Sequence, residues 1–227
     1  MNRVLLFAAS LLLLAGCAAQ TPQPEVEYEP RTTRAPRSDE INIDYPVFPE
    51  YSGFVNVAIR EAAYSVLGWY DLDFFEPEER LTLDIEYKVK LKTDGLLSIV
   101  FRGLGYIMYT AHPNNLLYTL NLDVQTGEPV RLADRVLMDE ALADALHKAA
   151  KETLEPEAYE LYKQDYIDCA YEEGHSFLTE LAGADTEGTA FYSCFTPDRI
   201  GVVLPCKASS NYHYELEISL GDINLAD

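Results

Sequence analysis

Histidines are the side chains of this sequence that most readily exchange protons near neutral pH, so their positions decide whether general acid–base catalysis is expected. The four are His112, His147, His175 and His213. None lies in a catalytic motif, because the sequence contains no HExxH, GxSxG, P-loop or dinucleotide-binding glycine pattern. His112 precedes Pro113 in a predicted loop and is the best candidate for a hydrolase, whereas His147 is expected to be a structural histidine inside a helix.

Cysteine thiols could supply a nucleophile, a metal ligand or a disulfide. Besides Cys17 the sequence has Cys169, Cys194 and Cys206, at spacings that match no zinc pattern. Cys169 is close to His175 in sequence, but it falls on the apolar stripe of a predicted helix, which favours a buried or disulfide-bonded thiol over a nucleophile. In an oxidising compartment we expect one disulfide among the three, in any of three pairings. We predict no catalytic residue, cofactor or metal site.

Tyrosine is the other residue type that could form a binding surface, with 16 copies. An exposed ring gives a large contact area at low entropy cost, which suits protein or sugar ligands. Most of these tyrosines fall on predicted strand and helix faces that need core residues, so we assign the majority to packing. The candidates for exposure and binding are Tyr106, Tyr109, Tyr212 and Tyr214, together with His112.

The N-terminal residues have the order of an export signal. Arg3 is the only charge before Cys17, and residues 4–14 are almost wholly apolar but shorter than the roughly 20 residues of a transmembrane helix. The end, Leu14-Ala15-Gly16-Cys17, resembles the lipobox of bacterial lipoproteins, in which cleavage before the cysteine follows attachment of diacylglycerol to its sulfur.

The lipobox resemblance predicts a signal peptide at residues 1–16 and a lipid on Cys17. Acyl chains such as palmitate contribute about 0.8 kcal/mol per buried methylene, so two or three of them anchor a protein firmly. We expect a lipid-anchored protein of the cell envelope that faces the extracytoplasmic side. The alternative is an ordinary signal peptide that happens to contain a cysteine.

Charge limits the partners. The chain has 17 Lys and Arg against 38 Asp and Glu, a formal net charge of −21, and removing residues 1–16 with Arg3 gives −21 − 1 = −22. Nucleic acid is therefore not expected as a partner, because binding it needs clustered Lys and Arg. The same charge attracts a basic protein, although plain solubility is a simpler explanation.

The folded region is predicted to begin after a tether. Residues 17–40 combine the lipidated cysteine with a stretch rich in Pro, Thr, Glu and Arg that is expected to be disordered. Alternating apolar residues from Ile41 predict a first strand. Apolar residues then recur three or four apart from Tyr51 to Trp69, which predicts a helix.

Alternation of apolar and polar residues predicts three further strands. Residues 81–91 alternate without a break, and the chain returns through residues 97–101. The dipeptide Asp94-Gly95 between them predicts a type I′ turn, because glycine tolerates positive φ. A third strand is predicted at residues 116–124, closed by a turn around residues 125–127.

The C-terminal half is predicted to contain helices followed by strands. Asp139 is placed to cap a helix over residues 138–149, and Pro156 to open a second helix at its first turn. A hairpin over residues 190–204 and a last strand over residues 212–218 complete the pattern. Long strands with helices between them indicate an α+β fold, with mostly antiparallel sheets and helices packed on one face.

Short motifs in the middle of the chain resemble a known extracellular bacterial domain, the RsiV/PdaC-like family. They are an AHP loop at residues 111–113, a strand ending at Asp123, a TG turn at residues 126–127 and an LxD lead-in at residues 132–134. Residues 195–200 and 216–220 look like its C-terminal strands. Residues 41–108 look like the strand–helix–strand–strand unit that precedes it, so we place two coupled subdomains at 41–108 and 109–227.

The RsiV/PdaC-like family forms the outer part of a lysozyme-sensing anti-sigma factor and an accessory region of a peptidoglycan deacetylase. This sequence carries neither a sigma-binding segment with a membrane span nor a deacetylase domain, so those activities are not implied. The resemblance implies ligand capture at the cell surface. We therefore expect a non-enzymatic binding domain for a cell-wall-related ligand, first a basic protein such as lysozyme, with a peptidoglycan- or glycan-binding module as the alternative and a hydrolase third.

Overall fold

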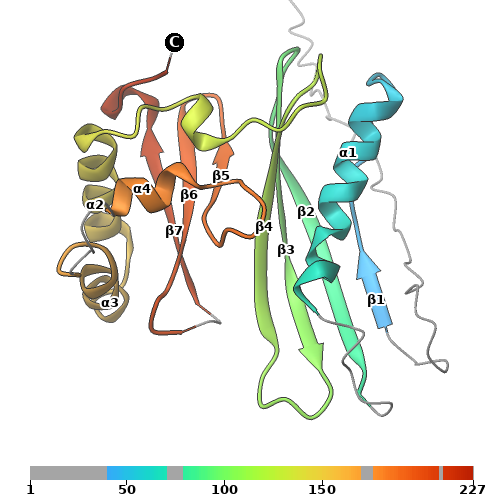
Figure 1. Ribbon diagram of the computed structural model, residues 1–227, viewed down its shortest axis with the longest axis horizontal. Helices are drawn as coiled ribbons and strands as arrows, with labels where there is room; N and C mark the ends of the chain where they lie inside the picture. Colours follow the sequence, from blue (N-terminus) through green and yellow to red (C-terminus); the bar gives the residue numbers. More distant parts are fainter. Residues whose placement is uncertain (1–39, 71–78, 170–175, 210–211, 227) are drawn as a thin grey trace, which may run out of the picture.

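Two β-sheets lie between two groups of helices in the computed structural model, which describes residues 40–70, 79–169, 176–209 and 212–226. The helices are α1 (Gly53–Tyr64), α2 (Glu140–Thr153), α3 (Pro156–Tyr166) and α4 (Phe177–Ala182). Figure 1 shows the layers in order: α1, the first sheet, the second sheet, and then α2 to α4. This confirms the predicted α+β fold with mostly antiparallel sheets. The predicted signal peptide, Cys17 and His175 lie outside the described residues.

The first sheet contains four strands in the order β1-β2-β3-β4. Their bounds are β1 (Glu40–Ile43), β2 (Leu81–Lys92), β3 (Leu96–Ile107) and β4 (Asn114–Asp123). β1 pairs with β2 in parallel, and the other two pairs are antiparallel. The predicted alternation is observed from Leu81 to Val89, where Leu81, Leu83 and Ile85 are buried between polar neighbours that face the other side. A register shift after Val89 breaks it, so Leu91 packs against the core of the second sheet instead.

Helix α1 covers the outer face of the first sheet. Its buried side chains are Val55, Ile59 and Ala63, spaced four apart as one helical face requires. A 3-10 helix, η1 (Ser65–Trp69), continues it to the edge of the sheet at β4. We expected Trp69 on the buried stripe, but 47% of its surface is exposed because the helix ends over the edge rather than over the centre of the sheet.

The second sheet is antiparallel, in the order β5 (Tyr192–Phe195), β6 (Arg199–Pro205) and β7 (His213–Ser219). Helices α2, α3 and α4 cover its outer face, where the larger core contains Leu146, Tyr162 and Leu216. The predicted cap is present, because Asp139 Oδ1 accepts from Leu142 N at 3.1 Å. Pro156 opens α3 as predicted. No described helix has both the length and the hydrophobicity needed to span a bilayer.

The first sheet extends past the predicted subdomain boundary at residue 108. β4 pairs with β3 along ten residues, from Leu96 opposite Asp123 to Gly105 opposite Asn114. The sheets therefore divide after Asp123. Short 3-10 turns follow at η3 (Leu132–Asp134) and, near the C-terminus, at η4 (Leu220–Asp222).

The turn between β2 and β3 is not the predicted type I′ turn, because Gly95 does not have a positive φ. Thr93 closes the turn instead: its amide donates to the Leu96 carbonyl at 2.9 Å, and its hydroxyl accepts from Leu96 N at 2.9 Å.

The predicted disulfide is absent, since Cys169, Cys194 and Cys206 are all unpaired. Cys194 lies in the small core between the sheets, beside Val100 and other apolar side chains. Cys206 lies in the separate core under α2 to α4, where its sulfur accepts from the Tyr214 hydroxyl at 3.4 Å. The two buried thiols thus belong to different cores, so they are not placed to form a disulfide with each other.

Candidate binding site

A pocket of about 720 Å³ lies where β4, the last strand of the first sheet, faces the loop that leads into β5. Its volume is within the range of small-molecule and side-chain pockets. One wall comes from η1 and the opposite wall from the 185–190 loop, β5 and β6. The lining residues used below are Trp69, Asn115, Leu117, Tyr118, Thr119, Asp185, Glu187, Tyr192, Tyr212 and His213.

An aromatic cluster forms the floor of the pocket. Trp69 meets Tyr118 edge-on at 5.5 Å between ring centroids and lies nearly parallel to Tyr192 at 6.4 Å. Tyr118 donates its hydroxyl to the Ala63 carbonyl at 2.6 Å, which fixes the last turn of α1, just before η1, against β4. Burial raises the pKa of Tyr118 and raises that of Tyr192 to about 12, so both phenols stay neutral at physiological pH. The exposed part of Trp69 is therefore a rigid, uncharged contact surface.

Asp185 anchors the loop side of the pocket. It has a left-handed backbone conformation, with φ at 63°, which aspartate tolerates better than most residues. Its carboxyl accepts from Ser193 N at 2.7 Å, from the Ser193 hydroxyl, from Leu132 N at 3.0 Å and from the Thr119 hydroxyl at 3.3 Å. Burial raises the pKa of Asp185, while these hydrogen bonds lower it. With both oxygens occupied, Asp185 holds the loop in place and is poorly suited to exchange protons with a substrate.

A buried polar network behind the pocket joins the two sheets. Ser98 on β3 donates its hydroxyl to Asn121 Oδ1 on β4 at 2.7 Å. Asn121 Nδ2 then donates to the Ser193 carbonyl on β5 at 2.9 Å, and Phe195 N donates to the Ser98 hydroxyl at 2.9 Å. All these groups are withdrawn from water, so the network fixes the relative position of the pocket walls.

Ion pairs join the sheets at their surface. Arg102 on β3 forms a two-pronged pair with Glu215 on β7, and His213 Nε2 lies 3.2 Å from the same carboxylate. Burial would raise the pKa of Glu215, but the hydrogen bonds from Arg102 and His213 outweigh it and lower the pKa to about 2. Lys90 pairs with Glu217 at 3.3 Å in the same gap between the sheets.

The pocket is acidic in character. Its exposed carboxyl group is that of Glu187, since the oxygens of Asp185 are already hydrogen-bonded. The lining also includes His213, which lies beside Glu215, and no Lys or Arg among the residues that the structure describes. Glu187 is exposed and forms no ion pair within the described part of the chain. Elsewhere in the described residues, seven Lys and Arg side chains form ion pairs with acids: Lys90, Lys92, Arg102, Arg131, Lys148, Lys163 and Lys207.

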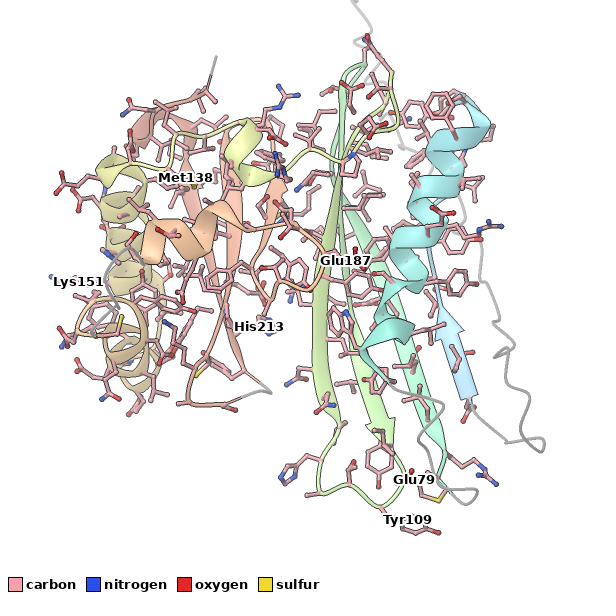
Figure 2. All side chains as sticks on the ribbon, viewed as in Figure 1. Glu79, Tyr109, Met138, Lys151, Glu187 and His213 are labelled. Atoms are coloured by element: carbon pink, nitrogen blue, oxygen red, sulfur yellow. The ribbon has the colours of Figure 1, made fainter. Side chains whose placement is uncertain are left out.

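The structure brings one of the five binding candidates into the pocket. Tyr212 lines it with 43% of its surface exposed. Tyr106, Tyr109 and His112 lie at the far end of the long β3–β4 hairpin, where Figure 2 shows Tyr109 at the tip. Tyr109 is 78% exposed and has a φ of 74°. No side-chain interaction of His112 is present within the described residues, so no carboxylate activates it there.

Our expectation that Tyr214 is exposed is wrong. It is fully buried, because the inward face of β7 alternates through Tyr214, Leu216 and Ile218. Its hydroxyl donates to Asp165 Oδ2 at 2.8 Å, deep under α3. A ligand at the surface therefore does not reach it.

The other polar side chains of interest have structural roles. His147 Nδ1 lies 2.7 Å from the Tyr162 hydroxyl and its ring stacks on Phe177, in agreement with the structural histidine expected from the sequence. Burial lowers the pKa of His147, so it stays neutral at pH 7. Within the described residues, no cluster of His, Cys, Asp and Glu could hold a metal ion.

Tyr212 apart, the pocket residues were not among the sequence candidates, and the most important of those missed are Trp69, Asp185, Glu187 and Tyr192. Trp69 is the single tryptophan of the chain. Because it falls on the predicted apolar stripe of a helix, it was assigned to the core and not to a binding surface. Asp185 and Glu187 lie in a stretch without periodicity, and their positions depend on contacts with β4 and β5. No local pattern could have identified them.

Comparisons with known proteins place the fold. No protein-family model matches the chain, and no curated protein matches it significantly. A crystal structure of a DUF3298 family protein from Pseudomonas aeruginosa PAO1 superposes with a TM-score of 0.54 at 16% identity, over 90% of this chain and 93% of that one. The chain shares the fold of this DUF3298 protein. A DUF3298 family member from Bacteroides fragilis NCTC 9343 gives a TM-score of 0.48 at 15% identity, over 91% and 93% of the two chains.

Proposed function

We propose that this protein is a non-enzymatic binding domain that acts outside the cytoplasm, is anchored to the membrane by lipid on Cys17, and captures a cell-wall-related ligand. The first ligand that we propose is a basic wall-degrading protein such as lysozyme. One observation carries the proposal: the pocket combines exposed aromatic faces with carboxyl groups and, within the described residues, contains no Lys or Arg. Such a lining suits a Lys or Arg side chain of a partner.

Charge at long range supports the same ligand class. The net charge of −21 would accelerate the encounter with a basic protein, and this attraction alone fades beyond about 8 Å at physiological salt. Specific binding therefore has to come from a desolvated contact. Trp69 and Tyr212 are the exposed aromatic side chains of the pocket and are placed to provide it.

The test is titration of lysozyme against the mature chain carrying Cys17→Ser, which prevents lipidation, across a range of ionic strength. We expect a saturable complex at 0.15 M salt that Trp69→Ala weakens at least tenfold. The matched control is Phe54→Ala, since Phe54 is exposed to a similar degree on α1 but lies outside the pocket. Absence of a saturable complex at this salt concentration would refute lysozyme as the ligand.

Peptidoglycan is the second candidate, favoured by the nearly parallel rings of Trp69 and Tyr192, which provide a stacking surface for a sugar. Co-sedimentation with purified peptidoglycan should then be insensitive to salt and lost in both Trp69→Ala and Tyr212→Ala. Sedimentation that disappears in moderate salt would exclude this reading, because stacking on uncharged rings does not depend on ionic strength.

A further inference from the structure

The free edge of β4 beside the pocket has unused main-chain hydrogen-bonding groups. The C-terminal part of β4 shows which way these groups point. Asn121 O accepts from Val130 N at 2.9 Å, and Asp123 N donates to Glu128 O at 3.0 Å, so the main-chain groups of Asn121 and Asp123 point away from β3. Main-chain direction repeats every second residue in a strand, and the β3–β4 register runs without a shift. The N–H and C=O groups of Leu117 and Thr119 therefore also point away from β3, toward the pocket that these residues line.

No main-chain partner occupies that side of Leu117 or Thr119 among the residues that the structure describes. Residues 128–130 already pair with the C-terminal part of the same edge, at residues 121–123, with a β-bridge between Leu122 and Pro129. The chain thus adds a strand-like segment to β4 at residues 121–123, whereas within the described residues the edge at Leu117 and Thr119, beside the pocket, has no such segment. Residues 114–120 contain no Pro, Lys or bulge, the features that usually protect an exposed strand edge.

The pocket continues the plane of the first sheet. Trp69 from η1 and Tyr192 from β5 line the pocket together, with their ring centroids 6.4 Å apart, and Glu187 lines it from the loop before β5. In Figure 2, Glu187 is drawn over β4, and both line the pocket. A strand added beside β4 would point alternate side chains toward the side of η1 and toward the second sheet, as neighbouring residues of a strand do.

We propose that the edge of β4 from Leu117 to Thr119 is a docking site for an extended, basic segment of a partner protein, which pairs with Leu117 and Thr119 and places a Lys or Arg side chain between Tyr212 and Glu187. This inference rests on the proposed function and names the surface and the form of its ligand. Strand addition supplies affinity through the main chain, and the acidic, aromatic pocket supplies selection for a cation. A second copy of this chain is disfavoured as the occupant, because two chains of net charge −21 repel each other.

Hydrogen exchange on the unaltered mature domain, with only Cys17→Ser, tests the inference without a folding risk. The probes are lysozyme, a capped heptapeptide of alternating Thr and Val with a central Lys, and the same peptide with a central Glu. We expect saturating lysozyme and the Lys peptide to slow exchange of the Leu117 and Thr119 amides at least tenfold. The Glu peptide should bind at least ten times more weakly than the Lys peptide.

The outcomes separate the inference from the proposed function. Saturable lysozyme binding without protection of these two amides would overturn the edge site and leave the proposed function standing. Protection by the Lys peptide without any lysozyme binding would support the edge site and reject lysozyme. Protection by neither probe overturns both. Protection that rises with protein concentration in the absence of a probe would assign the edge to a second copy and overturn the inference.

A pair of substitutions at one position supplies an independent check. Thr119→Pro removes the outward N–H, and proline is tolerated on an edge strand because that N–H does not bond within the sheet. Thr119→Val keeps the N–H, and both changes remove the same hydroxyl bond to Asp185. We expect at least a tenfold loss of Lys-peptide binding in Thr119→Pro and less than a twofold change in Thr119→Val. Equal binding by two folded variants would contradict strand addition.

Discussion

The buried amide of Asn121 should be one of the largest single contributors to the coupling between the two sheets, and Asn121→Leu tests this. Asn121 is 3% exposed, and its side chain bonds to both Ser98 and Ser193. Because Ser193 N donates to Asp185 on the outer side of β5, the Ser193 carbonyl also points outward and depends on Asn121 for its hydrogen bond. Leucine has a similar size but no polar atom.

The magnitude follows from the groups left without partners. Asn121→Leu removes the acceptor of the Ser98 hydroxyl and the donor to the Ser193 carbonyl, both in fully buried residues. Each buried polar group without a partner costs about 1–3 kcal/mol, and the added apolar burial offsets part of this. We expect the free energy of unfolding to fall by about 2–4 kcal/mol, a large share of the roughly 5–15 kcal/mol typical of a domain.

Urea unfolding monitored by tyrosine and tryptophan fluorescence measures this change. Asn42→Leu on β1 is the matched control, because Asn42 is exposed and its replacement should change stability by less than about 0.5 kcal/mol. The double variant with Ser98→Ala should lose about 1–2 kcal/mol less than the sum of the single changes, since the two side chains bond directly. Additive effects, or a loss below about 1 kcal/mol for Asn121→Leu, would refute the network as a connection between the sheets.

Three further predictions follow from local geometry. The folded-state pKa of Glu215, about 2 against a reference of 4.5, means that its ion pair stabilises the fold above pH 4.5 and loses that effect as the pH falls toward 2. Because the Glu215 side chain is 41% exposed, solvent screening limits the loss of unfolding free energy in Glu215→Gln to about 1 kcal/mol at pH 7. Urea unfolding should show that the stabilities of the variant and the unaltered protein converge in acid. A difference that stays constant with pH would contradict the lowered pKa of Glu215. A Cβ at Gly103 would lie 1.9 Å from a main-chain oxygen of β2, so Gly103→Ala should lower the free energy of unfolding by more than about 2 kcal/mol. The control is Gly53→Ala, where a Cβ would have no atom within 4 Å and stability should not fall. Equal thermal midpoints of the two variants would show that the strands can move apart to accept the methyl group. Cys169 should be alkylated by iodoacetamide in the native protein, whereas Cys194, whose pKa burial raises, should react only in urea, and fast native labelling of Cys194 detected by mass spectrometry would disprove its burial.

The elements that the sequence predicted correctly depend on contacts between residues close in the chain. Alternating apolar residues predicted the strand β2 correctly, because a strand that buries one face places every second side chain on that face. Asp139 and Pro156 mark helix starts because a cap and a fixed φ act within one helical turn. Tyr212 was predicted to be the first residue of the last strand, but β7 begins at His213, which leaves Tyr212 just before the strand and in the lining of the pocket.

The incorrect or incomplete predictions concern residues whose environment comes from distant segments. Gly95 did not need a positive φ, because Thr93 closed the turn with its side chain. Tyr214 was expected at the surface, but α3 covers it with Asp165. The subdomain boundary at residue 108 was placed by motif resemblance, whereas β-pairing carried the first sheet on to Asp123.

The sequence by itself determined the export and lipidation prediction at Cys17, the acidic charge, the α+β class and most element positions, because each depends on composition or on periodicity within about ten residues. Only the tertiary structure decided where the candidate site lies. Trp69 from η1, the edge of β4 and the loop at Asp185 are separated by 46 to 116 residues along the chain, and no local pattern records that they meet. They meet because β4 ends its sheet with an open side and the buried bonds of Asn121 hold β5 beside it.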